Sequence, residues 1–266
     1  MKKKVLFISQ EMTPYLPENE MSVLSRELPQ GIQEKGKEIR TFMPRFGSIN
    51  ERRNQLHEVI RLSGMNLIID DTDHPLIIKV ASIPTARMQV YFIDNEDFFK
   101  RKQTVCSKDG TEFDDNDERA LFFARGVLET IKKLRWTPDI IHCSGWFTSL
   151  APLLIKKLMN EDPFFEKSKV VYTVFNDEFK NPLDKRMKDK VIEMGINKKE
   201  LKLLDDPTYE NLSKLAIEMS DAVIQGSESI NEEVKKFIEE SGKPFMPYHD
   251  KDSFIDKCND FYDSIV

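Results

Sequence analysis

The sequence has few cysteines and no excess of positive charge. Its three cysteines, Cys106, Cys143 and Cys258, are scattered without the CxxC spacing of a zinc site. Their odd, sparse number suits a reducing compartment and does not support a disulfide framework, so we expect no bound metal. Acidic residues outnumber basic ones by 46 to 40, which gives a net charge of −6. No general basic field therefore favours a nucleic acid as a partner.

Long apolar runs are also missing. None approaches the ~18 residues of a membrane-spanning helix, so we expect no membrane partner. The first residues, MKKKVLFISQEM, begin like a signal peptide. Their apolar run has only about four residues, however, which is shorter than the ~7–15 that a signal sequence needs. We therefore interpret residues 4–9 as a buried strand and expect a cytoplasmic protein.

What the sequence does contain is a regular alternation of short apolar runs with helical periods. Continuous β-rich runs predict buried parallel strands, and apolar spacings of three or four predict helices. Strands are expected at 4–9, 38–44, 138–144 and 169–176, helices at 21–35, 117–134 and 147–160, an antiparallel or mixed meander at 58–94, and short, lightly packed surface helices at 180–207. This alternation predicts an α/β fold with a Rossmann-like, doubly wound, mostly parallel sheet.

The first strand-to-helix junction lacks what such sheets normally use to bind phosphate. Phosphates usually sit at this junction on glycines and helix N-terminal N–H groups. Here the stretch QEMTPYLPENEMSVLSRELP (10–29) has no glycine and no lysine, and Pro17, Glu18, Asn19 and Glu20 stand before the helix. One like-charge contact at about 4 Å costs about 4 kcal/mol at an effective dielectric of ~20. The junction is therefore unsuited to phosphate; the alternative is an acidic loop that simply faces water.

Six segments share the order, spacing and flanking apolar pattern of one protein family. They are SQEMTPYLPENEMSVLSRELP (9–29), MPRFG (43–47), VYFIDNEDFF (90–99), DNDERALFFARGVLETIKKLRWTPDIIHCSGWFTSLAPL (115–153), VYTVFN (171–176) and SDAVIQGSESINEEV (220–234). Each segment alone is a weak signal, but together they are specific. The chain resembles the bacterial glycogen synthases and plant starch synthases, which are ADP-glucose-dependent glucosyltransferases of the GT-B type. The resemblance covers the N-terminal catalytic half of that family.

The resemblance implies the positions of a donor and sugar site, and this chain departs from several of them. The family's KTGG phosphate loop aligns with residues 17–20. Its HAHDW motif becomes HCSGW here, so a sugar-site histidine is replaced by Ser144 and an aspartate by Gly145. The histidine of the family's TIHN motif is Phe175, whereas Asn176 is retained. These departures predict that binding and transfer of a sugar nucleotide are weakened or lost.

Other family positions are retained, and each has two readings. The resemblance makes Asp115 an active-site carboxylate, but the same residue could cap the following helix. His142 is a candidate catalyst or a strand-end histidine hydrogen-bonded to backbone, and Trp146 is a site residue or a core residue. Ser227 keeps a family serine or caps the next helix. The candidate catalytic residues are Asp115 and His142, and the candidate substrate-binding residues are Asn116, Arg119, Ser144, Trp146, Asn176 and Ser227.

The chain is shorter than the resemblance implies. The family continues into a second domain that holds the nucleotide, whereas about sixteen residues follow Asp250 here. We therefore expect a catalytic-type domain at 1–250, no second GT-B domain, and a helix at 251–266 that docks back through one apolar stripe.

Together these features predict a starch/glycogen synthase-like domain that is catalytically degenerate in isolation and uses no cofactor. The alternatives are a glucosyltransferase completed by a partner chain, or a non-catalytic scaffold that binds α-glucan or protein. The expected partners are α-glucan or ADP-glucose, bound weakly or not at all, and a partner chain or a second copy of this chain.

Overall fold

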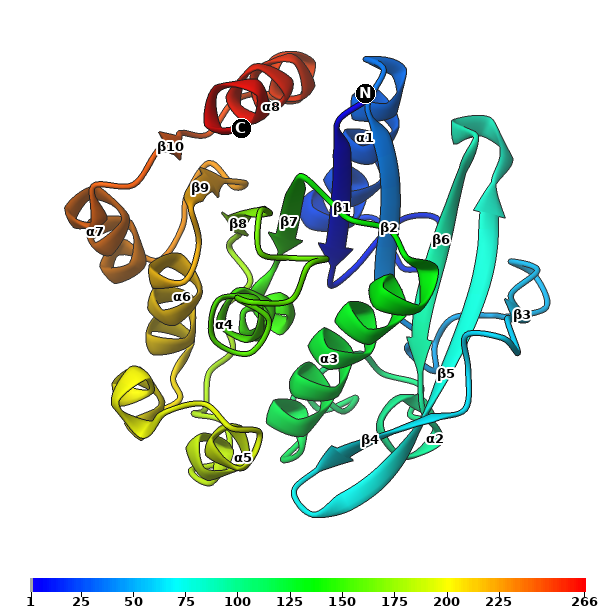
Figure 1. The fold of residues 1–266 in the computed structure, drawn as a ribbon, viewed down its shortest axis with the longest axis vertical. Helices are drawn as coiled ribbons and strands as arrows, with labels where there is room; N and C mark the ends of the chain where they lie inside the picture. Colours follow the sequence, from blue (N-terminus) through cyan, green and yellow to red (C-terminus); the bar gives the residue numbers. More distant parts are fainter. Residues whose placement is uncertain (1) are drawn as a thin grey trace.

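A ten-stranded, mostly parallel sheet runs through the computed structural model, which describes residues 2–266 (Figure 1). The strand order is β10-β9-β8-β7-β1-β2-β6-β5-β3, with β4 paired to β5. Neighbouring strands from β10 to β6 are parallel. These parallel strands are β1 (Lys4–Ser9), β2 (Glu38–Pro44), β6 (Met88–Asp94), β7 (Ile140–Ser144), β8 (Lys169–Val174), β9 (Ala222–Gln225) and β10 (Phe245–Met246). The predicted α/β, doubly wound fold is confirmed.

The expected meander forms the antiparallel edge of the sheet. It consists of β3 (His57–Glu58), β4 (Met65–Ile69) and the long β5 (Thr72–Ile83). β5 pairs antiparallel with β6, and β3 and β4 both pair antiparallel with β5. An antiparallel edge needs only short turns between its strands, which explains the closely spaced apolar runs in this part of the sequence.

Helices cover both faces of the sheet, as the crossovers between parallel strands require. In Figure 1, α3 and α4 lie in front of the strands and α1 lies behind β1 and β2. The predicted helix at 147–160 is in fact a short 3₁₀ turn, Trp146–Thr148, followed by the α4 helix. The helices are α1 (Glu20–Glu34), α2 (Glu96–Phe99), α3 (Asn116–Leu134), α4 (Leu150–Lys157), α5 (Met187–Glu193), α6 (Tyr209–Glu218), α7 (Glu232–Ser241) and α8 (Lys251–Ile265).

The charged segment 180–207 packs more firmly than its sequence suggests. It contains α5 and two 3₁₀ turns, Lys198–Glu200 and Lys202–Asp205. Val191, Leu201 and Leu204 are fully buried. This packing could not be predicted from the sequence because lysines and acidic residues separate the few apolar residues that are buried.

The α8 helix lies against α1. Ile255 packs so closely on Gly31 that a Cβ atom there would lie 2.5 Å from the Ile255 methyl group. On the buried side of α8, Phe254, Cys258 and Tyr262 are shielded from solvent. Lys37, just after α1, donates to Asn259 at 2.7 Å and to Asp263 at 3.1 Å.

None of the helices in the described residues 2–266 is both long and apolar enough to cross a bilayer.

Candidate functional site

The loop between β1 and α1 is held by a capping box. Asn19 is the N-cap of α1; its side chain accepts a hydrogen bond from the Ser22 backbone N–H at 2.8 Å, and the Ser22 hydroxyl accepts one from the Asn19 N–H at 2.9 Å. The Asn19 amide also donates to Glu11. Capping groups of this kind satisfy the first N–H groups of a helix, which a ligand phosphate would otherwise use.

Glu20 connects this loop to the loops that follow β8 and β9. Its carboxylate accepts a hydrogen bond from the Ser227 hydroxyl, and that hydroxyl accepts one from the Asn176 backbone N–H at 3.0 Å. Hydrogen bonds therefore join the loops that follow β1, β8 and β9, at the carboxyl ends of these strands. This is the edge of a parallel sheet at which ligands usually bind.

Gly145 leaves room that two side chains fill, Gln10 in the loop after β1 and Met21 in α1. Its φ angle is +87°, and an added Cβ atom would lie 2.9 Å from the Gln10 amide oxygen and 2.9 Å from the Met21 sulfur. The same Gln10 oxygen accepts the Phe147 backbone N–H at 3.0 Å. An aspartate at position 145, as the resemblance implies for the family, does not fit this arrangement.

Phe175 fills the next position along the sheet edge. Its ring lies against Gly226, where a Cβ atom would be 2.6 Å from the ring carbon Cε1. The side chain is 2% exposed, and its backbone carbonyl accepts the Tyr209 hydroxyl at 2.9 Å. An apolar, buried ring thus stands where the resemblance places the histidine of the TIHN motif.

Asp177 is a functional candidate that the sequence analysis missed. Its carboxylate accepts the Trp146 backbone N–H at 2.8 Å and the Tyr209 hydroxyl at 3.1 Å. Burial raises the pKa of Asp177 to about 7, and the nearby charge of Glu11 also raises it. The available signal was its position, directly after the retained Asn176 at a strand end.

These side chains surround a cavity that we call the strand-end hollow, with a volume of about 210 Å³. Glu11 and Asp177 give it two further carboxylates besides that of Glu20. Its lining residues are Gln10, Glu11, Asn19, Glu20, Met21, Phe175, Asn176, Asp177 and Ser227.

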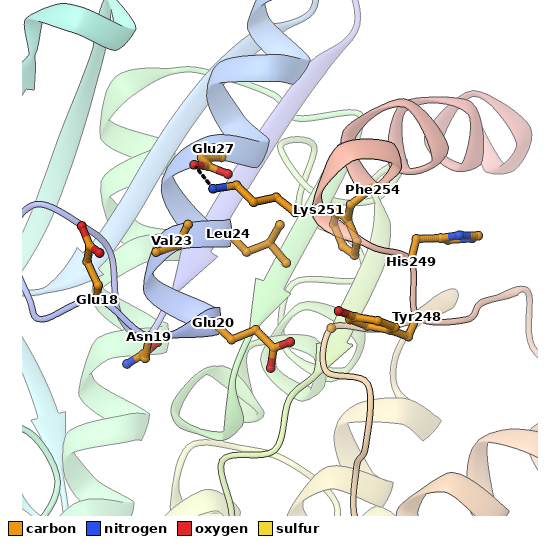
Figure 2. A pocket seen from close by; sticks show the side chains of 11 residues that line it. Glu18, Asn19, Glu20, Val23, Leu24, Glu27, Tyr248, His249, Lys251 and Phe254 are labelled. Atoms are coloured by element: carbon orange, nitrogen blue, oxygen red, sulfur yellow. Dashed lines mark ion pairs between the residues drawn. The ribbon is translucent and has the colours of Figure 1, made fainter.

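A second cavity of about 290 Å³, the α1–α8 pocket, lies beside it. Figure 2 shows Glu20 pointing into this pocket toward Tyr248, with Val23 and Leu24 along the α1 wall. An ion pair between Glu27 and Lys251, with 2.8 Å between Oε1 and Nζ, bridges α1 and α8 at the pocket (Figure 2). Glu20 lines both cavities.

His142 lies within the sheet and is enclosed. Its Nδ1 atom is hydrogen-bonded to the Tyr262 hydroxyl of α8, and its Nε2 atom lies 2.6 Å from the Thr173 hydroxyl of β8. The side chain is 1% exposed, and burial lowers the pKa of His142 to about 3. The imidazole is therefore neutral at pH 7, and both nitrogens are engaged.

Asp115, Asn116 and Arg119 form a separate cluster at the start of α3. Among the described residues, the Asp115 carboxylate caps no helix N–H group; it pairs with both Nη atoms of Arg101. Buried Arg119 donates to Asn116 at 2.7 Å and to the Phe98 carbonyl at 2.8 Å. These contacts fix the loop before α3, and the buried Nη2 atom of Arg119 has no hydrogen-bond partner among the described residues.

The remaining predicted positions are mostly enclosed. Ser144 ends β7 and is 6% exposed, and Trp146 is 2% exposed with its ring against Phe179. Pro17 and Glu18 stay exposed on the loop. The structure thus brings Glu20, Asn176 and Ser227 together at one edge, whereas Asp115 and His142 do not line the strand-end hollow.

Elsewhere, three carboxylates lie close enough together to bind a metal ion, but a lysine ammonium group already lies between them. Asp117, Glu118 and Asp184 offer oxygens within 4.8 Å of one another. The Lys190 Nζ atom lies 2.8 Å from Asp117, 2.7 Å from Glu118 and 3.0 Å from Asp184. A cation would have to displace a lysine that is 2% exposed, so this cluster serves as a buried ion pair.

Comparisons with known proteins identify the family of this chain. Residues 4–243 match the family described as the starch synthase catalytic domain. The glycogen synthases of Chlorobium limicola and Chlorobaculum tepidum are each 39% identical to this chain over 174 residues, which is 65% of this chain and 36% of each relative. The chain thus spans about a third of the length of these curated relatives.

A solved structure gives the same fold. The catalytic domain of starch synthase IV from Arabidopsis thaliana, bound to ADP and acarbose, has a TM-score of 0.74 and 19% identity. The match covers 96% of this chain and 53% of that one. The resemblance seen in the sequence motifs is confirmed, and this chain belongs to the starch synthase catalytic domain family.

Proposed function

We propose that this chain is a starch/glycogen synthase-like domain of α-glucan metabolism in the cytoplasm that does not transfer glucose by itself. The observation that carries the proposal is the hydrogen bond between Ser227 and Glu20. It places a carboxylate of the chain at the sheet edge where a donor phosphate would have to bind.

The charge of the strand-end hollow supports this proposal. Glu11, Glu20 and Asp177 line it, with Asp177 about half ionised at pH 7, and no lysine or arginine is among its lining residues within the described part of the chain. Stabilising a departing diphosphate requires cations or N–H donors. A single carboxylate about 4 Å from a phosphate opposes binding by about 4 kcal/mol at an effective dielectric of ~20.

The packing around the hollow points in the same direction. Met21 fills the space beside Gly145, and Phe175 lies on Gly226. These contacts are tight, so a sugar group cannot reach Gly145 or Gly226 without displacing the Met21 or Phe175 side chain. The fold is kept while the polar groups that would hold a sugar nucleotide are replaced by internal contacts.

A transfer assay tests the proposal. Purified protein is incubated with radiolabelled ADP-glucose and glycogen, and label in the precipitated glucan is counted. We expect no incorporation above a protein-free control. Incorporation by the isolated chain would contradict the proposal, and incorporation only after adding host-cell extract would favour an enzyme completed by a partner chain.

Binding of α-glucan without catalysis is the second candidate. A cavity of about 390 Å³ lies between the loop after β1 and the loop at 102–107. Asn19, Ser48, Gln103 and Thr104 line it with amide and hydroxyl groups, which suit the hydroxyls of a sugar. The Arabidopsis neighbour is bound to acarbose, which is consistent with a glucan on this fold.

Affinity electrophoresis separates this second candidate from a scaffold that binds no sugar. Retarded migration in a native gel containing glycogen supports glucan binding. The Gln103→Ala variant should then migrate faster, and Gln30→Ala on the exposed side of α1 should behave like the parent protein. Equal mobility with and without glycogen rules out glucan binding.

A further inference from the structure

A basic hollow lies at the amino ends of the strands, at the opposite end of β1 and β2 from Glu20. Its volume is about 520 Å³, within the range of small-molecule sites. We call it the amino-end hollow. Four cationic side chains line it, from Lys2, Lys37, Arg40 and Arg87, and Glu38 is the one acidic residue among its lining residues.

The hollow exists because β2 and β6 separate at this end. Their pairing begins at Thr41 and Val90, so the first residues of each strand flank an opening. Ile39, Met88 and Tyr91 line the opening and are buried, which gives the hollow an apolar base beneath its charged groups. The position of the opening therefore follows from the pairing of the strands.

The cations of the hollow are only partly neutralised by the protein. Among the described residues, the side chains of Lys2 and Arg87 form no ion pair. The Arg40 Nη2 atom lies 3.8 Å from Glu38, whose carboxylate also accepts the Trp136 indole N–H at 2.6 Å. The Nε atom of Arg40 is buried and unpartnered among residues 2–266. A buried donor without a partner is costly, so the protein does not fully satisfy the Arg40 guanidinium.

Lys37 differs from the other three cations because an acidic side chain of the protein neutralises it. It is paired with Asp263 of α8 at 3.0 Å, which leaves Lys2, Arg40 and Arg87 as the three groups available to a ligand. Arg40 also lies over the Trp136 ring, with its guanidinium carbon 5.5 Å from the ring centroid. This stacking holds the guanidinium in one orientation and reduces the entropy lost on binding.

We propose that the amino-end hollow binds a small anion with several charges that carries a phosphate or diphosphate group. Guanidinium groups match phosphate oxygens in a planar, bidentate geometry, and Arg40 and Arg87 supply two of them. The net charge of −6 on the whole chain opposes an extended polyanion such as a nucleic acid. A compact anion that fits the hollow avoids that repulsion.

This site is independent of the strand-end hollow and of the proposed function. None of its lining residues lines the strand-end hollow or the α1–α8 pocket. Loss of sugar-nucleotide binding at the carboxyl ends therefore leaves it intact, and glucosyl transfer, if found, would not test it.

Isothermal titration calorimetry with inorganic pyrophosphate tests the proposal at constant ionic strength. We expect one saturable site per chain with a dissociation constant below about 1 mM, which corresponds to about −4 kcal/mol. The double variant Arg40→Gln, Arg87→Asn should bind at least about tenfold more weakly. Asparagine is chosen at 87 because that residue has a φ angle of +50°, which asparagine tolerates.

Two controls keep the outcome clear. The variant Lys198→Gln, Lys199→Gln removes two exposed charges elsewhere and should bind pyrophosphate like the parent. Circular dichroism shows whether the double variant is folded. If it is not, the single variant Lys2→Gln tests the proposal instead, because it changes an exposed side chain and should still weaken pyrophosphate binding. No saturable heat, or equal affinity in the hollow variants and the control, would overturn the proposal. Tighter binding of a single-stranded oligonucleotide that the same variants abolish would overturn the assignment to a small anion.

Discussion

The carboxylate of Glu20 accepts a hydrogen bond from the hydroxyl of Ser227, although 207 residues separate the two. One residue opens α1 and the other follows β9, so the bond joins the two sides of the sheet's switch region. Residues so distant in sequence meet only because the parallel strands align their carboxyl ends. In this family member the Glu20 carboxylate is therefore bound by a side chain of the same chain.

A double-mutant cycle on this pair should give a measurable coupling. Glu20→Ala and Ser227→Ala each remove one partner of a charge-assisted bond, and we expect a coupling free energy of about 1 kcal/mol because Glu20 is partly solvated. The measurement is urea unfolding of the four proteins. Glu18→Ala serves as the control, since Glu18 is exposed on the same loop. Additive effects of the two substitutions would show that the bond contributes nothing to stability.

Restoring the family aspartate at Gly145 should destabilise the fold. Gly145→Asp forces a side chain onto a φ angle of +87° and into Gln10 and Met21. We expect a loss of about 2–4 kcal/mol, the sum of backbone strain and overpacking. Gly36→Asp is the matched control, because Gly36 has a φ angle of +94° but open space around its Cα atom. If both variants lose the same stability, the contact with Met21 is unimportant.

The fold and the family could be predicted from the sequence because both rest on local patterns. The continuous apolar run at 4–9 and the helical period at 117–134 need no knowledge of distant contacts. The interior of the site could not be predicted in this way. The enclosure of His142 depends on Tyr262, which is 120 residues away, and the filling of Gly145 depends on Met21. Asp177 was missed because its burial comes from Trp146 and Tyr209 on other elements.

The buried His142 should make the protein lose stability in acid. Its pKa is about 3 in the folded chain and about 6.5 when unfolded, so the neutral form is favoured by folding. Its contribution is fully present above pH 6.5 and is lost as the pH falls toward 3, by about 3–5 kcal/mol in total.

Urea unfolding at several pH values checks this. His142→Gln should show a shallower fall in stability between pH 6.5 and 4 than the parent protein. His57→Gln, at an exposed histidine, should retain the parent slope. A parent-like slope in His142→Gln would assign the acid sensitivity to other groups.

Removing the ammonium group from the buried carboxylate cluster should be severely destabilising. Lys190→Met leaves Asp117, Glu118 and Asp184 facing one another, and Asp117 is 1% exposed. We expect a loss of about 3–5 kcal/mol at pH 7, because the variant retains buried charge without its partner. Partial recovery at low pH should follow as the carboxylates protonate.

Lys188→Met is the matched control for that prediction. Lys188 lies in the same helix and pairs with Asp205, whose side chain is 67% exposed. A pair of this kind is worth about 1 kcal/mol or less. Similar losses in the two variants would mean that burial of the Lys190 cluster adds no cost.

Truncation after His249 tests the role of α8. The shortened chain uncovers the surface against which Phe254, Cys258 and Tyr262 pack, and it removes a hydrogen-bond partner of the buried His142. Fully burying an aliphatic or aromatic side chain contributes about 1.5–3 kcal/mol, so we expect a loss of about 5 kcal/mol together with aggregation from the exposed apolar surface. Differential scanning fluorimetry and light scattering measure the two effects. Asp256→Ala, at an exposed position of α8 paired with Lys35, should leave both unchanged. A truncated chain that does not aggregate and keeps its melting temperature would mean that the domain is stable without α8. The contacts between α8 and α1 would then add nothing to a fold that the parallel sheet already determines.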